Sequence, residues 1–532
     1  MRKWLPIIVL GLAQFVMVID GTVMNVSITT VVADLGTTVS AMQLAIATFT
    51  LTMAAFMLAG AGIGDRIGRR RAFVVGNIIY GVGSFITAVA PGFAALFVGW
   101  SIIEGLGAVL VIPAIAALAA TNYSGRDRAI AYGILGGVAG AAAAAGPLIG
   151  GWVTSEFSWR WVFAAETIAI AAIILPLTSK VRDGARKAAT GRFDYLGAAL
   201  SAVAMGLIVL ALVSASTWGI IRPINPPFEV FGFSPVIPIV LAGVVVGRLF
   251  FAWERRVEAR GRSPLVGMDL LAIRPLRAGL GSQMILYFII AGTFFVLPLY
   301  LQTVLGLDAF ESGLRMLPMS IAIFVMALAG SRLAVRVSPR TLIQLGLLVS
   351  SSGVAMLIAS ITPEARGTLF SLAMAVIGMG LGLAVSQIGN VNLSAADESR
   401  SSEIGGLQGT TQNLGSSLGV ALAGAVLFIG LAATFNANLR DDPEVNTNLQ
   451  AAAREATSSG VQIVSTDQAQ AAVAAAGVPD EQVDNVVDAY SQAKLQSLRG
   501  ALAIVFLVGV LGLLVTGGLP KEPLGARGPP GA

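Results

Sequence analysis

The feature that most constrains this chain is a succession of long apolar runs. A helix needs about 20 residues to cross the roughly 30 Å hydrocarbon core of a bilayer, and its backbone groups must be hydrogen-bonded within the segment. Fourteen runs reach this length, and each predicts a membrane-spanning helix. They lie at 4–32, 41–63, 72–90, 93–120, 129–154, 161–178, 195–216, 235–252, 278–302, 314–333, 341–361, 368–389, 404–433 and 498–518.

Composition narrows the class of protein further. Only 12% of the residues are charged, against about 25% in a soluble protein, which excludes soluble enzymes, DNA-binding proteins and disordered chains. The chain has no Cys and no His, so no disulfide scaffold, thiolate or imidazole metal site, or His- or Cys-based catalysis is possible. We therefore expect an all-α membrane protein that is not an enzyme and holds no metal or cofactor.

The distribution of Lys and Arg predicts the orientation. Most of the 34 basic residues fall on one side of the predicted spans, in clusters such as 66–71, 180–192 and 255–277. Basic residues favour the cytoplasmic side, so an even number of spans places both termini in the cytoplasm. We interpret the first run as an uncleaved span, because it is too long for a signal peptide. The net charge of +5 needs no nucleic-acid partner to explain it, and the lipid bilayer is the partner that we expect.

Two short patterns recur about 270 residues apart. The turn 64–70 after the second span resembles 336–340 after the tenth, and Gly146-Pro147-Leu148-Ile149-Gly150 resembles Gly415-Ser416-Ser417-Leu418-Gly419. Two related bundles with a site between them are the usual construction of secondary transporters. We expect a six-helix bundle at 1–178, linkers and two inserted helices at 179–277, a second six-helix bundle at 278–520 and a cytoplasmic tail at 521–532. The alternative is chance similarity between glycine-rich helices.

One polar segment interrupts the second bundle. Residues 434–497 carry nine acidic residues against Arg440, Arg454 and Lys494. Residues 449–457 and 481–495 have helix-forming composition, and Gly460, Gly477 and Pro479 mark breaks. We expect a small helical or hairpin cap over the external mouth, which could receive an extracytoplasmic partner; a mobile solvated loop is the alternative.

Three acids lie inside the predicted spans: Asp20, Glu104 and Glu166. No phosphate-binding loop motif occurs, so ATP is not the energy source, and an ion gradient needs titratable groups in the membrane. We predict that Asp20 and Glu104 share a cavity and couple transport to protons. Glu166 is a third candidate, although it could instead complement a helix N-terminus near Arg160. Asp20 and Glu104 could alternatively be satisfied permanently by neighbours such as Thr22, Asn25 and Ser101.

Two glycine-containing patterns predict conformational roles. Asp65, Arg66, Gly68, Arg69 and Arg70, here called the latch turn, place an acid beside a tight turn full of arginines. We expect Asp65 to bond a neighbouring helix end while Arg66 and Arg69 bridge helices and hold the cytoplasmic side closed. Gly146, Pro147, Gly150 and Gly151 remove a backbone donor and side-chain bulk from one span, which predicts a kink and close packing.

With these motifs the chain resembles the major facilitator superfamily, and within it the fourteen-span drug:proton antiporter branch of multidrug efflux proteins. The latch turn matches the signature between spans two and three, with Ala61 in place of its opening Gly. The 146–151 pattern matches the antiporter signature of span five, with Ala142 in place of a Gly. Further matches are Asp20-x-Thr22-Val23-x-Asn25, Trp159-Arg160-Trp161 and Tyr300-Leu301-Gln302.

The departures from the family pattern concern the charged positions. Ser101 and Glu104 stand where the fourth-span signature usually has Arg and Gln, and Glu166 stands where Asn is common. Gly409 and Asn413 occupy positions where cation exporters often carry acids. The resemblance therefore implies an acidic cavity in the N-terminal half and a nearly uncharged C-terminal half.

The resulting hypothesis is export of amphipathic or cationic small molecules in exchange for protons, by a monomer in a bacterial cell membrane. Export of one endogenous metabolite, siderophore or lipid is the alternative within transport, and a non-transporting membrane scaffold or receptor is the alternative of another class. The residues expected to line the substrate cavity are Asn25, Ser101, Met284, Phe288, Gln302 and Asn413.

Overall fold

The computed structural model describes residues 2–123, 125–183, 193–221, 223, 226–262, 264–363, 367–396, 400–443, 445, 447–458, 461–476 and 478–523. These residues are helical almost throughout, and a single β-bridge among them joins Val230 to Phe233. The predicted all-α class is confirmed. The predicted breaks at Gly460 and Gly477, and most of the tail 521–532, lie outside the described residues.

Thirteen helices in the described part of the chain are long and apolar enough to cross a membrane, and a bent pair counted as one span makes fourteen. The prediction of fourteen spans is therefore confirmed. The helices that form them are α1 (Leu5–Val26), α3 (Val39–Ile67), α4 (Arg69–Ala88), α5–η2–α6 (Phe93–Asn122), α7 (Gly125–Glu156), α8–η3–α9–η4 (Arg160–Lys180), α10 (Tyr195–Trp218), α11 (Val236–Ala259), α13 (Arg274–Thr303), α14 (Ala309–Leu333), α15 (Pro339–Ser360), α16 (Gly367–Leu393), α17 (Ser401–Asp441) and α20–η6 (Asp480–Gly518).

The bent pair lies within α7. Its halves, Ile134–Ala143 and Ala145–Glu156, meet at 44°. Proline lacks an N–H and its ring excludes the carbonyl four residues earlier, so Pro147 opens the helix at Ala143, where the first half ends. The predicted kink is confirmed. The first predicted run, by contrast, is broken: α1 ends at Val26, and α2 (Ile28–Leu35) follows as a separate short helix.

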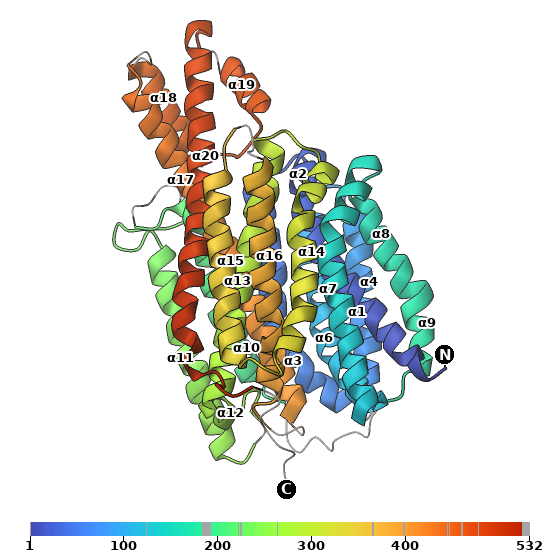
Figure 1. The fold of residues 1–532 in the computed structure, drawn as a ribbon. Coiled ribbons are helices and arrows are strands. Elements are labelled where there is room, and N and C mark those ends of the chain that lie inside the picture. The colour runs from blue at the N-terminus through green and yellow to red at the C-terminus, as the bar shows by residue number, and fades with distance from the viewer. Residues whose placement is uncertain are drawn as a thin grey trace.

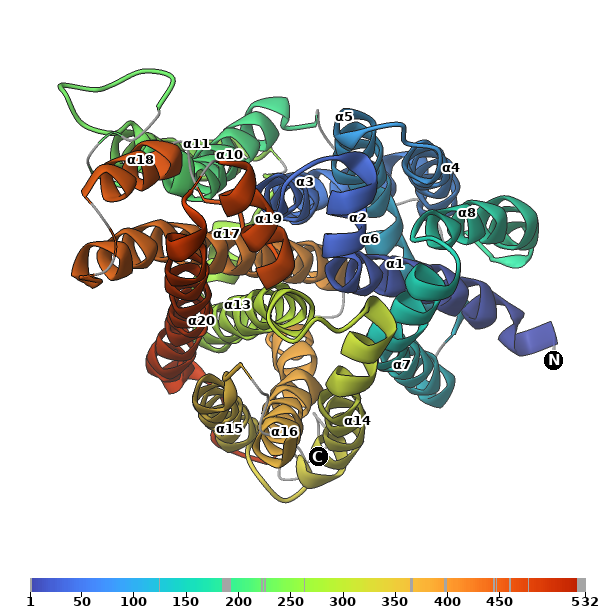
Figure 2. The same cartoon turned by 90° about the horizontal axis from the view of Figure 1, so that it is seen from above.

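Following the two predicted bundles, we call α1–α9 the first set and α13–α20 the second; Figures 1 and 2 show how these helices lie. Within the first set α1 packs on α7 and α4 on α6; within the second, α13 packs on α17 and α15 on α16. Between the sets, α3 contacts α17 and α14 contacts α7, so the second span of each set meets the fifth span of the other. The added pair α10–α11 lies beside them, with α10 against both α3 and α17.

The glycine repeat marks equivalent contacts. A Cβ at Gly146 would lie 1.8 Å from the Thr22 hydroxyl oxygen, and one at Gly150 would lie 2.5 Å from Val23, both on α1. A Cβ at Gly415 would lie 2.2 Å from the Met284 carbonyl oxygen on α13, and Gly419 is similarly tight against Phe288. The recurring sequence pattern therefore serves the same purpose twice, because each site brings two helix backbones into close contact.

The segment between the last two spans is helical. It consists of the extended ends of α17 and α20 with α18 (Thr447–Ser458) and α19 (Thr466–Ala475), and we keep the name cap for it (Figure 1). The predicted helix 481–495 is not separate, because it continues into the last span as α20. Helix α19 was not predicted, although Ser465 and Gln468 form a capping box at its start, which is a recognisable N-terminal pattern.

A buried lysine fixes the cap to the bundle. Lys494 on α20 is 1% exposed, and its Nζ donates to the carbonyls of Thr303 (2.8 Å) and Val464 (3.0 Å). Thr303 is the last residue of α13, and Val464 lies just before α19. Both chain termini lie at the opposite end of the molecule from the cap (Figure 1). We refer to these as the cap end and the terminal end.

Candidate functional site: a buried carboxylate cluster

The three intramembrane acids lie together. Asp20, Glu104 and Glu166 each place a carboxylate oxygen within 4.8 Å of the others, and all three side chains are buried, at 0%, 0% and 4% exposure. We call these residues the carboxylate cluster. Asp20 and Glu104, which we expected to share a cavity, therefore lie close together, and Glu166 joins them.

Three spans supply the cluster. Asp20 belongs to α1 and Glu166 to α8, while Glu104 ends η2 (Phe97–Glu104), a π-helical turn within the fourth span. Single π-helical turns inside α-helices are frequent at functional sites. A Cβ at Gly83 of α4 would lie 2.6 Å from the Glu104 amide nitrogen. The absence of a side chain at Gly83 therefore allows α4 to pack directly against the backbone that carries Glu104.

Two donors orient the carboxylates. The Trp100 indole N–H lies 2.9 and 3.1 Å from the two oxygens of Asp20, and its ring stacks on Phe49 with centroids 4.8 Å apart. The Ser84 hydroxyl lies 3.1 Å from Glu166 Oε2 and also 3.1 Å from the Phe163 carbonyl. Neither donor was predicted, because a Trp and a Ser in an apolar run give no pattern that points to a partner on another helix.

The remaining oxygens of the cluster are poorly satisfied. Among the described residues, Oε1 of Glu166 has no hydrogen-bond partner, and the Tyr80 hydroxyl faces Asp20 and Glu104 without forming a hydrogen bond of ideal geometry with either. Unsatisfied buried polar atoms are uncommon in folded proteins. Oxygen ligands at this spacing suit a proton shared between carboxyls or a hard cation.

The alternative partners considered from sequence do not reach the cluster. Thr22 and Asn25 donate to carbonyls of their own helix, those of Ile19 (2.8 Å) and Gly21 (2.6 Å). Ser101 donates to the Ala45 carbonyl at 2.8 Å and ties η2 to α3. Their hydroxyl and amide donors are therefore used elsewhere, and the reading of a cluster satisfied by these neighbours is wrong.

Arg160 does not pair with Glu166. Its guanidinium binds Asp34 at the end of α2 and donates to the Ala90 carbonyl at 2.8 Å, and Trp159 donates to Asp34 at 3.0 Å. Partial burial by itself would raise the pKa of Asp34. The hydrogen bonds from Arg160 and Trp159 outweigh that effect, and the pKa is lowered. Arg160 is thus occupied at the cap end, whereas Glu166 accepts from Ser84 of α4.

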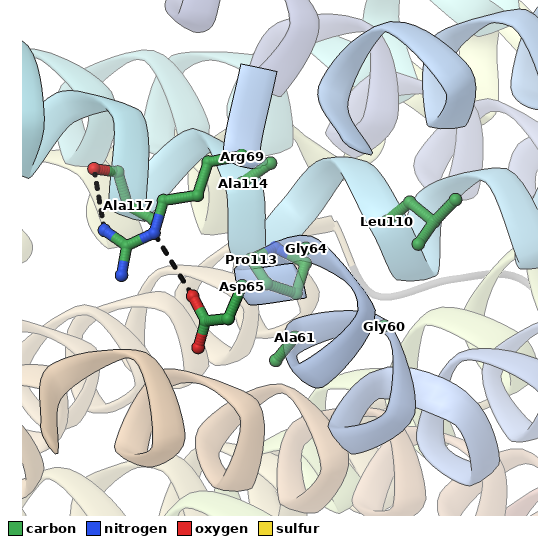
Figure 3. A pocket seen from close by; sticks show the side chains of 9 residues that line it. All are labelled: Gly60, Ala61, Gly64, Asp65, Arg69, Leu110, Pro113, Ala114 and Ala117. Atoms are coloured by element: carbon green, nitrogen blue, oxygen red, sulfur yellow. Dashed lines mark hydrogen bonds and ion pairs between the residues drawn. The ribbon is translucent and has the colours of Figure 1, made fainter. Parts of the chain in front are cut away.

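The latch turn joins α3 to α4, and Figure 3 shows how its Asp65 and Arg69 lie beside Ala117 of α6. Asp65 Oδ1 accepts from Arg69 Nε at 3.2 Å, and Arg69 also donates to the Ala117 carbonyl of α6 at 3.5 Å. Arg66 stacks on the Phe193 ring at 5.4 Å, and the Arg70 amide donates to Asp183. Gly68 has a φ of 99°, which only glycine adopts readily. Arg69 thus bridges helices as predicted, whereas Arg66 contacts the linker.

The 146–151 pattern lies where the two sets of helices meet. A Cβ at Gly151 would lie 2.3 Å from the Ala309 carbonyl oxygen, and one at Gly313 would lie 2.4 Å from the Pro147 carbonyl oxygen. The Phe310 amide donates to Ser155 at 3.1 Å. Helix α7 therefore touches α1 of its own set and α14 of the other, so the kink positions a contact that must change if the sets move.

The predicted cavity residues do not form one lining. Gln302 joins the two sets, because it donates to the Val26 carbonyl at 2.7 Å and bonds Thr29. Asn413 donates to the Gly409 carbonyl of its own helix. The backbones of Met284 and Phe288 pack against α17. Asn25 lies one turn after Gly21, where a Cβ would meet no atom within 4 Å, so open space adjoins α1 at Gly21.

Several exporters resemble this chain along most of its length. A probable actinorhodin transporter of Streptomyces coelicolor is 29% identical over 464 residues, covering 86% of this chain and 78% of that protein. The puromycin resistance protein pur8 of Streptomyces alboniger is 30% identical, covering 80% of this chain and 82% of that protein. The multidrug resistance protein Stp of Mycobacterium tuberculosis is 26% identical, with 82% and 78% covered.

A solved transporter structure has a similar fold. A bacterial homologue of the human lysosomal transporter Spinster, solved in an inward-facing and unoccupied conformation, superposes with a TM-score of 0.63 over 99% of both chains at 15% identity. Residues 10–420 match the Major Facilitator Superfamily. Because this match spans more than half of the chain, it shows that the chain belongs to the Major Facilitator Superfamily of membrane transporters.

Proposed function

We propose that this transporter exports amphipathic or cationic small molecules in exchange for protons bound by the carboxylate cluster. The observation that carries the proposal is the convergence of Asp20, Glu104 and Glu166 within 4.8 Å inside the membrane region. Three carboxylates this close and this buried cannot all be ionised without compensating charge. Among the described residues no ion pair reaches them, so a change in access to water would change how many protons they hold.

The arrangement supports a direct competition between proton and substrate. Open space adjoins Gly21, next to Asp20 on α1, so a cationic or polar group of a substrate could approach the cluster from that side. Proton uptake at the cap end would remove the negative charge that holds a cationic group, and the substrate would leave. Proton release at the terminal end would restore that charge for the next molecule.

The relatives support export as the direction of transport. Their names describe resistance to, or export of, antibiotics and other drugs, and toxic compounds must leave the cell for resistance to result. The predicted orientation, with basic residues at the terminal end, places the cap outside. In this orientation the latch turn lies on the cytoplasmic side, where Arg69 joins α3 to α6 within the first set.

Reconstitution with an imposed pH gradient tests the proposal. We expect wild-type proteoliposomes to move a lipophilic dye cation against its gradient, and Asp20→Asn, Glu104→Gln and Glu166→Gln each to abolish this coupling. Glu254→Gln is the matched control, because Glu254 is also buried but accepts from the Leu265 and Val266 amides near the terminal end. A gradient of Na⁺ at constant pH serves as the control for the driving ion.

The outcomes separate the alternatives. Full coupling in all three cluster variants would overturn the proposal and return the acids to a structural role. Transport driven by Na⁺ and not by pH would reject protons as the coupling ion. A dedicated exporter of one metabolite is favoured by relatives whose names mention a single compound, actinorhodin or tetracenomycin C; that reading predicts no dye movement but pH-driven movement of one compound. A scaffold or receptor would move nothing, and its cluster variants would be silent.

A further inference from the structure

The connection between the two added helices contains a strained aromatic hairpin. Within residues 226–235, Val230 and Phe233 exchange backbone hydrogen bonds of 3.0 Å, and the turn residues Phe231 and Gly232 both have positive φ, at 52° and 78°. Two positive φ values are typical of tight two-residue hairpin turns. The Ser234 amide donates to the Ile221 carbonyl at 2.9 Å, which fixes the base of the hairpin to the end of α10.

Phe231 is the unusual residue in this turn. Among the described residues it is the one non-glycine residue with positive φ, a conformation that is a genuine outlier for a bulky side chain. Asn or Gly would adopt it with little strain. The Phe231 side chain is also 96% exposed, so packing within the protein does not offset the strain. An interaction outside the protein would account for both features.

The neighbouring side chains extend the same apolar surface. Phe228 and Phe233 are 53% and 57% exposed, and Ile220 and Ile221 at the base of the hairpin are 48% and 57% exposed. We call these residues and Phe231 the aromatic tip. Large exposed apolar patches mark surfaces that contact a partner or a membrane. We therefore expect the aromatic tip to be covered by one of these.

The position of the hairpin identifies its partner. It leaves the cap-end termini of α10 and α11, and seen from above it projects sideways, away from the other helices (Figures 1 and 2). Helix α11 carries an exposed apolar face of Ile237, Leu241, Val244 and Val245, which in a membrane-spanning helix contacts lipid. The aromatic tip directly precedes this helix at its cap end, where the span would leave the bilayer.

We propose that the aromatic tip inserts into the leaflet at the cap end and anchors the α10–α11 pair to the bilayer. Aromatic side chains favour the boundary between headgroups and acyl chains, and inserting an apolar face there is a known mode of attachment. Helix α10 contacts α3 of one set and α17 of the other. An anchored pair would therefore provide a fixed support beside the interface at which the two sets move.

Site-directed spin labelling tests this directly, because the chain contains no Cys and a single introduced thiol is labelled without background. The test residue is Phe228→Cys, which leaves the turn intact. Val245→Cys on the lipid-facing side of α11 and Ala471→Cys on exposed α19 provide the lipid and water references. In proteoliposomes, accessibility is measured to oxygen, which concentrates in lipid, and to a water-soluble nickel chelate.

We expect the label at position 228 to behave like that at 245, with high oxygen and low nickel accessibility. Introducing Phe231→Asn beside it should raise the nickel accessibility several-fold, because the aromatic tip loses its central ring. The same Phe231→Asn variant should not lower the melting temperature in detergent, since Asn relieves the positive φ; this shows that the change is not caused by misfolding.

Two results would overturn the proposal. A label at position 228 that resembles the one at 471 would place the hairpin in water. A label protected from both reagents would indicate a protein contact, either a second copy of this chain or another protein. Neither result bears on proton coupling, since the hairpin does not contact the carboxylate cluster.

Discussion

At the residue scale, the carboxylate cluster depends on one indole. Trp100 donates to both oxygens of Asp20 and stacks on Phe49, so one side chain fixes the direction of the acid and packs η2 against α3. A carboxylate that accepts two contacts from one donor is held in a single orientation. Trp100 is therefore a positioning residue for Asp20, and it contributes without binding a proton itself.

The variant Trp100→Phe separates these two roles. Phe retains an aromatic ring against Phe49 but removes the N–H, so we expect the fold to survive and pH-driven dye transport to fall at least tenfold, the equivalent of about 1.4 kcal/mol. Transport rate and melting temperature are measured together. Unchanged transport would show that Asp20 needs no donor, whereas a collapse of the melting temperature would assign Trp100 to packing.

The ion pair between Arg400 and Asp269 at the terminal end predicts how the stability of the protein changes in acid. The Arg400 guanidinium, hydrogen-bonded to Asp269 of the short helix α12 (Met268–Ala272), holds the pKa of Asp269 below its usual range. A carboxyl whose pKa is lowered by folding stabilises the folded state above its unfolded pKa, near 3.9. That stability is present above about pH 5 and is lost as the pH falls through the lowered pKa.

We therefore expect Asp269→Asn to reduce the loss of melting temperature between pH 6 and pH 3.5. The effect should be small and should shrink further in high salt, because the Asp269 side chain is 59% exposed and surface pairs are screened. Asp467→Asn on the exposed side of the cap is a suitable control. An identical acid response in wild type and Asp269→Asn would contradict the assignment.

At the scale of helices, the glycine contacts have a matched test within α7. Gly146→Ala places a methyl group 1.8 Å from the Thr22 hydroxyl, whereas a Cβ at Gly136 meets no atom within 4 Å. We expect Gly146→Ala to cost about 1–3 kcal/mol through overpacking, and Gly136→Ala to be neutral or stabilising by up to about 1 kcal/mol. Thermal unfolding in detergent compares the two, and equal effects would contradict the proposed close contact.

The elements also show what the sequence could and could not predict. Apolar length predicts the spans, and Pro147 predicts the bend, because both depend on local chemistry. The meeting of Asp20, Glu104 and Glu166 depends on how three helices rotate about their axes, which no local pattern determines. The π-helical turn before Glu104 is a further example, since it changes which face of the fourth span carries the acid. Helix α19 was recognisable from its capping box and was missed.

At the scale of the whole molecule, the cap-end contacts hold the two sets together. Gln302 of α13 bonds α1 and α2 of the first set, and the α3–α17 contact is joined by Gln43, which donates to the Val420 and Ala421 carbonyls at 3.1 Å. A transporter that alternates between two open states has to break such contacts in one half of its cycle. A substitution at Gln302 would remove its hydrogen bonds to both α1 and α2 at once.

We expect Gln302→Ala to shift the population toward a state open at the cap end. The readout is the reaction of Asn25→Cys, beside the open space on α1, with a membrane-impermeant thiol reagent added from the cap side. The rate should rise several-fold over the same Cys in an otherwise unchanged chain. Gln408→Ala, near the start of α17, is the control, because its amide contacts only the Gly389 carbonyl at the terminal end. Equal rates in both variants would contradict a gating role for Gln302.

The attachment of the cap through Lys494 has a pharmacological consequence. Lys494 holds the carbonyl of Thr303, the residue after Gln302, so the cap and the closing contact of the bundle share one short stretch of backbone. In the proposed orientation the cap faces the medium. A peptide or antibody fragment that clamps α18 and α19 onto α20 would keep that stretch in place and arrest export, and it would do so without ever entering the cell whose efflux it blocks.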